Sequence, residues 1–167
     1  LSYRNNNESG TPDTYILTEN AVIDLNGKTL TIGTNDRFML AGDNITIKNG
    51  TIKAGTVYSS GKLQKIAYSL GVTAGSKNVV IENIDCEGGI EALGNGATVT
   101  LRNVTSNATT YYNMYLAGGA TATIESGDFT HVDKVHFYTQ TANDKVIVNG
   151  GTFSGGSPTH SGAGKLE

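Results

Sequence analysis

Four side chains of this 167-residue chain, Glu91, Tyr115, His136 and Tyr138, have the types and spacing that could do chemistry. Each lies in a short segment in which apolar residues alternate with other residues. Because successive side chains of a strand point to opposite faces, we expect these four on one exposed face, opposite the apolar residues. Aromatic rings beside a carboxylate suit contact with a sugar ring and hydrogen bonds to its hydroxyls. The sequence therefore predicts a glycan-binding face, which Tyr111 and Tyr112 would extend.

The same face also offers an acid–base pair, Glu91 with Tyr115 or His136, of the kind that a lyase or hydrolase uses. A catalytic site needs convergent groups in a concavity, so we assign no catalytic residue on a face expected to be flat. The run His131-x-Asp133-x-x-His136 has metal-binding residue types, but a loop and a strand do not preset them to converge. We therefore assign no metal and no cofactor. A register shift of one residue in this strand would exchange its two faces.

The segments that carry these residues belong to a repeated unit that organises the whole chain. The unit is clearest at 44–52, which has the pattern of a strand, a sharp turn and a strand, and variants of it recur along the sequence. The second inward residue of each unit serves as an anchor, and the anchors are spaced 20 to 24 residues apart, with one interval of 34. This periodicity with strict alternation is typical of a β solenoid. The anchors are Leu25, Ile47, Ile81, Leu101, Ile124 and Val148.

Each unit contributes one residue to each of several stacked columns. The anchor and the residue two positions before it are expected to form the aliphatic interior. Asn and Gly tolerate left-handed backbone, and stacked Asn side chains can bond as a ladder, so the residue two positions after the anchor is a corner. The corner column is Gly27, Asn49, Asn83, Asn103, Ser126 and Gly150. The column directly after the anchors alternates in charge from Lys48 to Glu125, which predicts a salt-bridge ladder.

A further strand is expected before each anchor strand, which gives every coil three faces. These strands are expected at 38–41, 68–72, 89–93, 113–116 and 135–139. The expected fold class is all-β: a single-stranded, right-handed parallel β-helix (solenoid) of about six three-faced coils.

The boundaries follow from where the repeat begins and ends. Residues 15–155 are expected to form the β-helix domain, with an insertion at 56–67, and residues 1–14 a polar N-terminal cap or lead-in. Residues 156–167 have linker composition and predict a flexible tail, whose last three residues resemble a vector-derived extension. We therefore expect neighbouring domains in a longer chain.

Composition limits the partners. The net charge is −3 and the Lys and Arg residues do not cluster, whereas nucleic acid or an anionic membrane surface would need a basic footprint. No apolar run approaches the roughly 20 residues of a membrane helix. We therefore expect no nucleic acid and no membrane insertion. The single cysteine, Cys86, is expected to be a small buried thiol.

The repeats at 23–30, 45–52 and 146–153 resemble those of right-handed parallel β-helix proteins, the pectate-lyase-like superfold. They look especially like adhesin-like surface proteins of gut bacteria, in which Asn-Gly and Gly-Gly-Thr-Phe coils abound. Enzymes of this fold would imply paired aspartates with Gly-His-Gly and Arg-x-Lys, or a calcium cluster with an arginine base. The sequence lacks the first set, and its acidic residues do not gather at one outward position.

The leading hypothesis is therefore a non-catalytic, extracellular β-helix module of a bacterial surface protein, adhesin-like, secreted or at the cell surface. Its expected partner is a glycan or host-surface ligand. One alternative is a polysaccharide lyase or glycoside hydrolase acting along the β-helix face. Another is a structural segment of a phage fibre or tailspike.

Overall fold

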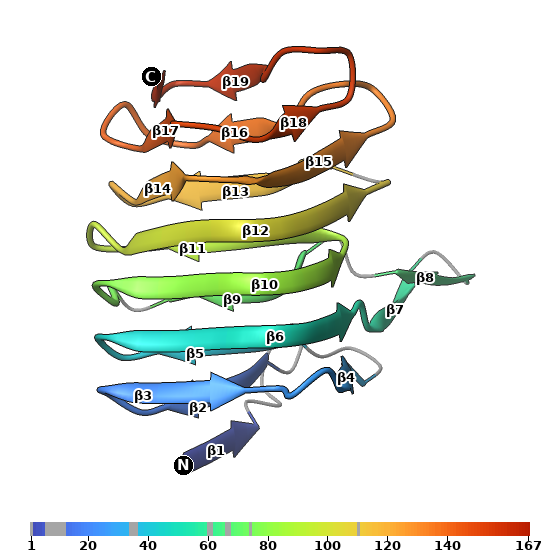
Figure 1. Cartoon of the computed structure of the whole chain (residues 1–167), viewed down its shortest axis with the longest axis vertical. Coiled ribbons are helices and arrows are strands. Elements are labelled where there is room, and N and C mark those ends of the chain that lie inside the picture. Colours follow the sequence, from blue (N-terminus) through green and yellow to red (C-terminus); the bar gives the residue numbers. More distant parts are fainter. Residues whose placement is uncertain are drawn as a thin grey trace.

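The chain forms a parallel β-solenoid of about six turns (Figure 1). The computed structural model describes residues 2–5, 13–33, 37–59, 62–65, 68–73, 75–109 and 111–167, with backbone alone for 2–5, 13–17, 57–59 and 62–65. Within these residues every regular element is a strand and there is no helix. The predicted all-β solenoid is confirmed.

Two long sheets form the walls of the solenoid. In spatial order, the eight-stranded sheet contains β1 (Ser2–Asn5), β2 (Asp13–Leu17), β5 (Arg37–Ala41), β9 (Tyr68–Val72), β11 (Gly89–Leu93), β13 (Met114–Ala117), β16 (Phe137–Thr139) and β19 (His160–Gly162). The ten-stranded sheet runs through β20 (Lys165–Leu166), β17 (Lys145–Val148), β14 (Thr121–Ile124), β12 (Thr98–Ala108), β10 (Val79–Glu87), β6 (Ile45–Lys53) and β3 (Ala21–Asp24), and β4 (Thr29–Thr31), β15 (Gly127–His131) and β18 (Thr152–Phe153) join it. Among the described pairs, all are parallel except β1–β2 and the pair formed by β7 (Thr56–Ser59) and β8 (Lys62–Lys65).

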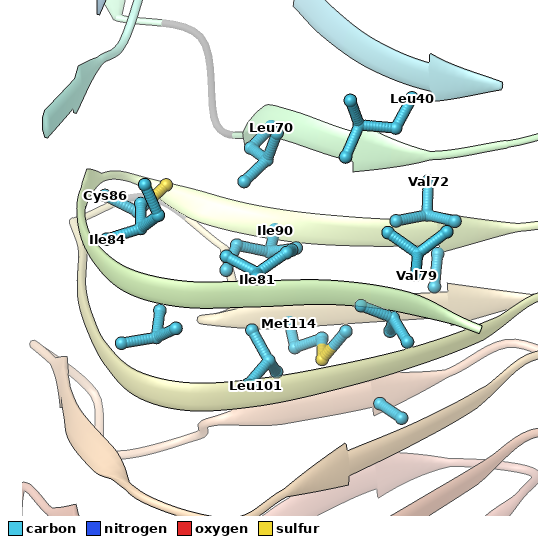
Figure 2. Close-up of a cluster of buried hydrophobic side chains, with 14 of the residues drawn as sticks. Leu40, Leu70, Val72, Val79, Ile81, Ile84, Cys86, Ile90, Leu101 and Met114 are labelled. Carbon is cyan, nitrogen blue, oxygen red and sulfur yellow. The ribbon is translucent and has the colours of Figure 1, made fainter. Parts of the chain in front are cut away.

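The core lies between the two sheets and is built from stacked aliphatic side chains. Figure 2 shows side chains of β9, β10 and β11 pointing into this space, among them Leu70, Ile81 and Ile90. All three are fully buried. Burying one such side chain contributes about 1.5–3 kcal/mol, so the columns supply most of the stabilisation. Cys86 is buried in the same cluster, as predicted, and burial raises the pKa of its thiol to about 12.

The predicted anchors hold in every coil except the first. β3 pairs with β6 so that Ile23, and not Leu25, lies opposite Ile47. The prediction of Leu25 as the first anchor is therefore wrong by two residues. The physical reason for this two-residue shift is at Gly50, where an added Cβ would lie 2.5 Å from the Leu25 Cβ. Leu25 fills the space that the missing side chain of Gly50 leaves.

Asparagines form the predicted ladder at the corner. Asn83 Nδ2 donates to Asn49 Oδ1 (3.1 Å), and Asn103 Nδ2 donates to Asn83 Oδ1 (2.9 Å). All three have left-handed backbone, with φ between 49° and 60°. In the first coil this conformation is found at Asn26 as well as at the predicted Gly27. In β6, β10 and β12 the corner asparagine lies in the middle of the strand. The residues that follow it in the same strand form the third face of the coil.

The column of alternating charge is present and begins one coil earlier than predicted, with ion pairs at both of its ends. Because β3 is shifted, Asp24 takes the place predicted for Asn26, and its Oδ2 lies 3.9 Å from Lys48 Nζ. Farther along, Arg102 Nε donates to Glu125 Oε2 at 2.6 Å and Arg102 Nη1 lies 4.0 Å from Glu82. These pairs are largely exposed, so each contributes little on its own and the column mainly favours the correct register.

Both predicted boundary segments contain strands. β1 pairs antiparallel with β2, which starts at Asp13, so residues 13–14 already belong to the solenoid; residues 1 and 6–12 lie outside the described residues. The prediction of a flexible tail at 156–167 is wrong, because β19 pairs with β16 and β20 pairs with β17. Backbone hydrogen bonds hold these strands, and Leu166 of β20 also packs against the core.

The insertion predicted at 56–67 contains a hairpin. Its strands, β7 (Thr56–Ser59) and β8 (Lys62–Lys65), are antiparallel and project away from the coils (Figure 1). Residues 60–61 and 66–67 lie outside the described residues.

The asparagine ladder makes a testable contribution to stability. Asn83→Ala removes hydrogen bonds to Asn49 and Asn103 and places a Cβ-bearing residue without a polar side chain at φ 52°. We expect the free energy of unfolding to fall by about 2–3 kcal/mol, against about 1 kcal/mol for Asn83→Gly, which keeps the left-handed backbone. Urea denaturation measures both. Equal losses in the two variants would contradict the backbone part of this account.

Candidate ligand-binding site

Three of the four predicted site residues lie in one row on the outer face of the eight-stranded sheet. The parallel register places Glu91 of β11 beside Tyr115 of β13, and Tyr115 beside Tyr138 of β16. The residues that flank them in sequence, such as Met114 and Leu116, are fully buried in the core. The predicted alternation is therefore correct for β11 and β13 and for the strand residues of β16.

Glu91 is held in an ion pair that the sequence analysis did not find. Arg37 Nη1 donates to Glu91 Oε1 at 2.5 Å, although the two residues are 54 positions apart. Glu91 is only 4% exposed even though it is on the outer face. Gly71 lies between Met39 and Glu91 in the row, and a Cβ there would come within 3.0 Å of Glu91 Cγ. Because Gly71 has no side chain, the Glu91 side chain has room to pack against the sheet.

The prediction that His136 shares this exposed face is wrong. His136 is fully buried, and its ring packs against Phe153 with centroids 5.3 Å apart. β16 begins only at Phe137, so strand alternation does not extend back to His136. The ring is instead bonded to the last coil: Thr159 N donates to its Nδ1 (3.2 Å), and its Nε2 lies 3.1 Å from Ser154 Oγ.

Tyr68 joins the site through an irregularity of β9. The register between β9 and β11 shifts at Gly89/Ile90, so Tyr68 lies opposite Gly89 while Leu70 lies opposite Ile90. Strict alternation would have put Tyr68 on the inner face with Leu70 and Val72. A bulge of this kind redirects a side chain, and bulges are common beside functional sites. Gly89 then accommodates the ring, because an added Cβ would lie 2.7 Å from Tyr68 Cδ1.

Five tyrosines form a chain of ring contacts on this face. From Tyr111 the contacts run to Tyr68 (centroids 6.3 Å apart), Tyr115 (5.7 Å), Tyr138 (5.5 Å) and Tyr112 (5.0 Å). The rings of Tyr115 and Tyr138 are within 8° of parallel. At that separation parallel rings cannot lie side by side in one plane, so they stack with a lateral offset. The two rings therefore do not form a single flat surface for a sugar.

The same five tyrosines line an open pocket of about 350 Å³, which we call the tyrosine pocket. A second pocket of about 470 Å³ adjoins it and shares Tyr111 and Tyr112 with it. The other residues that line this second pocket are Thr109, His131, Asp133 and Val135. The site is thus a concavity, in which half-buried and exposed aromatic rings lie beside polar groups.

The phenols of Tyr68 and Tyr115 stay protonated at neutral pH. Burial raises the pKa of Tyr68 far above its ordinary value of 10.0, although a hydrogen bond from the Tyr112 backbone acts in the opposite direction. Burial also raises the pKa of Tyr115, and the neighbouring Tyr138 and Glu91 add to the effect. Both hydroxyl groups can therefore donate a hydrogen bond to a ligand as well as accept one.

Two buried histidines, His131 and His136, lie near each other, and His131 lines the second pocket. His131 Nδ1 accepts hydrogen bonds from the backbone N–H of Asp133 (3.0 Å) and of Val135 (3.4 Å), which leaves the ring proton on Nε2. Burial lowers the pKa of both His131 and His136, and the proximity of the two rings lowers that of His136 further. Among the described residues no group of three or more His, Cys, Asp or Glu side chains could hold a metal ion.

No family model matches this chain, and neither a curated protein nor a solved structure matches it. In the part of the chain that the structure describes, no helix is long and apolar enough to cross a membrane. The site is therefore interpreted from its own residues.

Gly89 provides a test of how the tyrosine pocket is packed. In Gly89→Ala the new methyl group would clash with the Tyr112 carbonyl and with the Tyr68 ring. We expect a loss of about 1–3 kcal/mol in the free energy of unfolding, together with a change in tyrosine fluorescence. Gly33→Ala is the matched control, since nothing lies within 4 Å of its added Cβ, and should change stability by less than about 0.5 kcal/mol. Equal effects in the two variants would disprove the packing.

The buried histidines predict a stability that falls in acid. A histidine whose pKa is lowered in the folded state binds a proton more readily when unfolded, so its stabilising effect is present above the ordinary value of 6.5 and is lost as the pH falls below it. Urea denaturation from pH 7.5 to 5 should show this loss, with a slope of at most about 1.4 kcal/mol per pH unit for one group. His136→Gln should make the dependence of the free energy of unfolding on pH less steep. The dependence that remains should come from His131. An unchanged slope in this variant would contradict the assignment.

Proposed function

We propose that this chain is a non-catalytic, extracellular, adhesin-like β-helix module of a bacterial surface protein, and that it binds carbohydrate at the tyrosine pocket. The observation that carries the proposal is the convergence of Tyr68, Tyr111, Tyr112, Tyr115 and Tyr138 on one concavity. Small-molecule sites are typically concave and largely aromatic, with a few polar groups that fix orientation. Phenol rings supply the apolar contact for sugar C–H groups, and their hydroxyls supply hydrogen bonds.

The arrangement of the acidic and basic groups supports binding more than catalysis. Of the two acid–base pairs that the sequence offers, Glu91 with His136 is not assembled, because His136 is buried against Phe153, whereas Glu91 and Tyr115 are neighbours. Glu91 is itself engaged with Arg37. A general acid or base must reach the proton that it transfers, and neither Glu91 nor His136 offers that reach on this face.

The location and kinship are part of the same proposal. The resemblance of the Asn-Gly and Gly-Gly-Thr-Phe corners to adhesin-like proteins of gut bacteria, within the pectate-lyase-like superfold, supports a secreted or surface protein. A solenoid fold by itself supports no particular activity, so the tyrosine pocket and not the coil carries the functional claim.

A glycan array together with a soluble polysaccharide screen tests the proposal. We expect the wild-type protein to bind a subset of glycans, and Tyr115→Ala to lose about tenfold or more in affinity because it opens the ring contacts to Tyr68 and Tyr138. Val22→Ala is the control: Val22 is 66% exposed and lies on β3 of the other sheet, so this change should leave binding intact.

Two outcomes would contradict the proposal. The first is the absence of binding to any glycan, or equal binding by wild type and Tyr115→Ala. The second is depolymerisation of a polysaccharide that is lost in Glu91→Gln, which would make the module an enzyme.

A further inference from the structure

The two adjoining pockets differ in chemistry in a way that defines the ligand. Among the residues that the structure describes, only tyrosines line the tyrosine pocket, and they offer aromatic surface and hydroxyl groups. The second pocket adds a carboxylate from Asp133, a hydroxyl from Thr109 and the imidazole of His131. Sugar recognition combines apolar contact with directional hydrogen bonds. Here the tyrosine pocket supplies apolar contact on one side of Tyr112, and the second pocket supplies hydrogen-bonding groups on the other side.

Tyr111 and Tyr112 join the pockets into one groove. Tyr112 stacks on Tyr138 of the tyrosine pocket, with centroids 5.0 Å apart, and on His131 of the second pocket, with centroids 6.4 Å apart. Tyr111 lines both pockets, and its side chain is 61% exposed. A ligand that occupies one pocket therefore meets the same two rings that border the other.

Two features of the groove indicate a ligand, independently of its shape. Tyr111 has a φ of 150°, a conformation that a bulky residue rarely adopts, and backbone strain of this kind is concentrated at binding sites. In the second pocket, His131 is 5% exposed and its Nε2 has no hydrogen-bond partner among the described residues. Because Nδ1 accepts from the backbone, Nε2 carries a proton, and a buried donor without an acceptor is costly.

Charge narrows the ligand class. None of the described residues that line the two pockets is a lysine or an arginine, whereas Asp133 brings a carboxylate. A uronic acid or sulfated sugar would meet this carboxylate without a compensating cation, which disfavours it. A sugar hydroxyl, by contrast, can donate to Asp133 while a neighbouring hydroxyl accepts from a donor such as the Thr109 hydroxyl.

We propose that the groove binds a neutral oligosaccharide of at least two sugar units, with one unit in the tyrosine pocket and the next in a second subsite formed by Thr109, His131 and Asp133. This inference rests on the proposed function and adds the length and charge of the ligand. Tyr111 and Tyr112 form the boundary between the subsites and contact both units.

Isothermal titration calorimetry with three neutral sugar ladders, each a series of one sugar in increasing chain length, tests the inference. The probes are the methyl β-glycosides of glucose, mannose and N-acetylglucosamine and their β1,4-linked oligomers of two to four units, with oligogalacturonates of the same lengths as the acidic comparison. For at least one neutral ladder we expect affinity to rise about tenfold or more from one unit to two or three, a gain of about 1.4 kcal/mol, and oligogalacturonates to bind more weakly.

Variants separate the second subsite from the first. Asp133→Ala keeps the backbone N–H that His131 accepts, and Thr109→Val removes only a hydroxyl. Each should bring the affinity for the oligomers down towards that for the single sugar and leave the affinity for the single sugar unchanged. Asp85→Ala removes an exposed carboxylate from β10 on the other sheet and should change neither.

The outcomes distinguish this inference from the proposed function. Binding that does not depend on length, oligomer affinity that both variants retain, or a preference for oligogalacturonates would each overturn the second subsite while leaving glycan binding in place. Failure of every neutral ladder would also overturn it, and the array with Tyr115→Ala then decides separately whether the module binds glycan at all.

Discussion

Parallel backbone hydrogen bonding between successive coils is the interaction on which the rest of this protein depends. It fixes the spacing of neighbouring strands at about 4.8 Å and brings residues some twenty positions apart into one row. The core columns, the asparagine ladder and the charge ladder all follow from this register, because each is one position of the repeat stacked on itself. The last coil shows the dependence clearly, since β19 and β20 pair in register with almost no core-forming side chains of their own.

The candidate site arises where the repeat is interrupted. Glu91, Tyr115 and Tyr138 share a row because the register is regular, but Tyr115 and Tyr138 become part of a concavity only through irregular features. The shift in β9 redirects Tyr68, and the segment before β13 brings Tyr111 and Tyr112 over the sheet. Glycine has a matching role, since Gly89 makes room for the Tyr68 ring and Gly71 makes room for Glu91. A regular coil thus supplies the platform, and local departures from it supply the pocket.

Most of the fold follows from sequence periodicity, whereas much of the site does not. Alternation and the spacing of Asn49, Asn83 and Asn103 predict the coils, because those signals repeat and each copy supports the others. Leu25 was misplaced since the space beside Gly50 exists only after two coils are stacked. His136 was placed on the outer face because alternation was extended beyond the start of β16, and Tyr68 was missed because a bulge leaves no mark in a two-residue pattern. The Arg37–Glu91 pair joins residues whose distance in sequence carries no local signal.

The central claim is that the five tyrosines of this pocket, out of eight in the chain, contact a carbohydrate ligand. The most direct measurement is NMR of protein labelled with ¹³C in the tyrosine rings and titrated with a glycan that the array identifies. Shifts and ligand contacts confined to Tyr68, Tyr111, Tyr112, Tyr115 and Tyr138 are the result that this account predicts. Ligand contacts at Tyr3, Tyr15 or Tyr58, with the five pocket resonances unmoved, would contradict it.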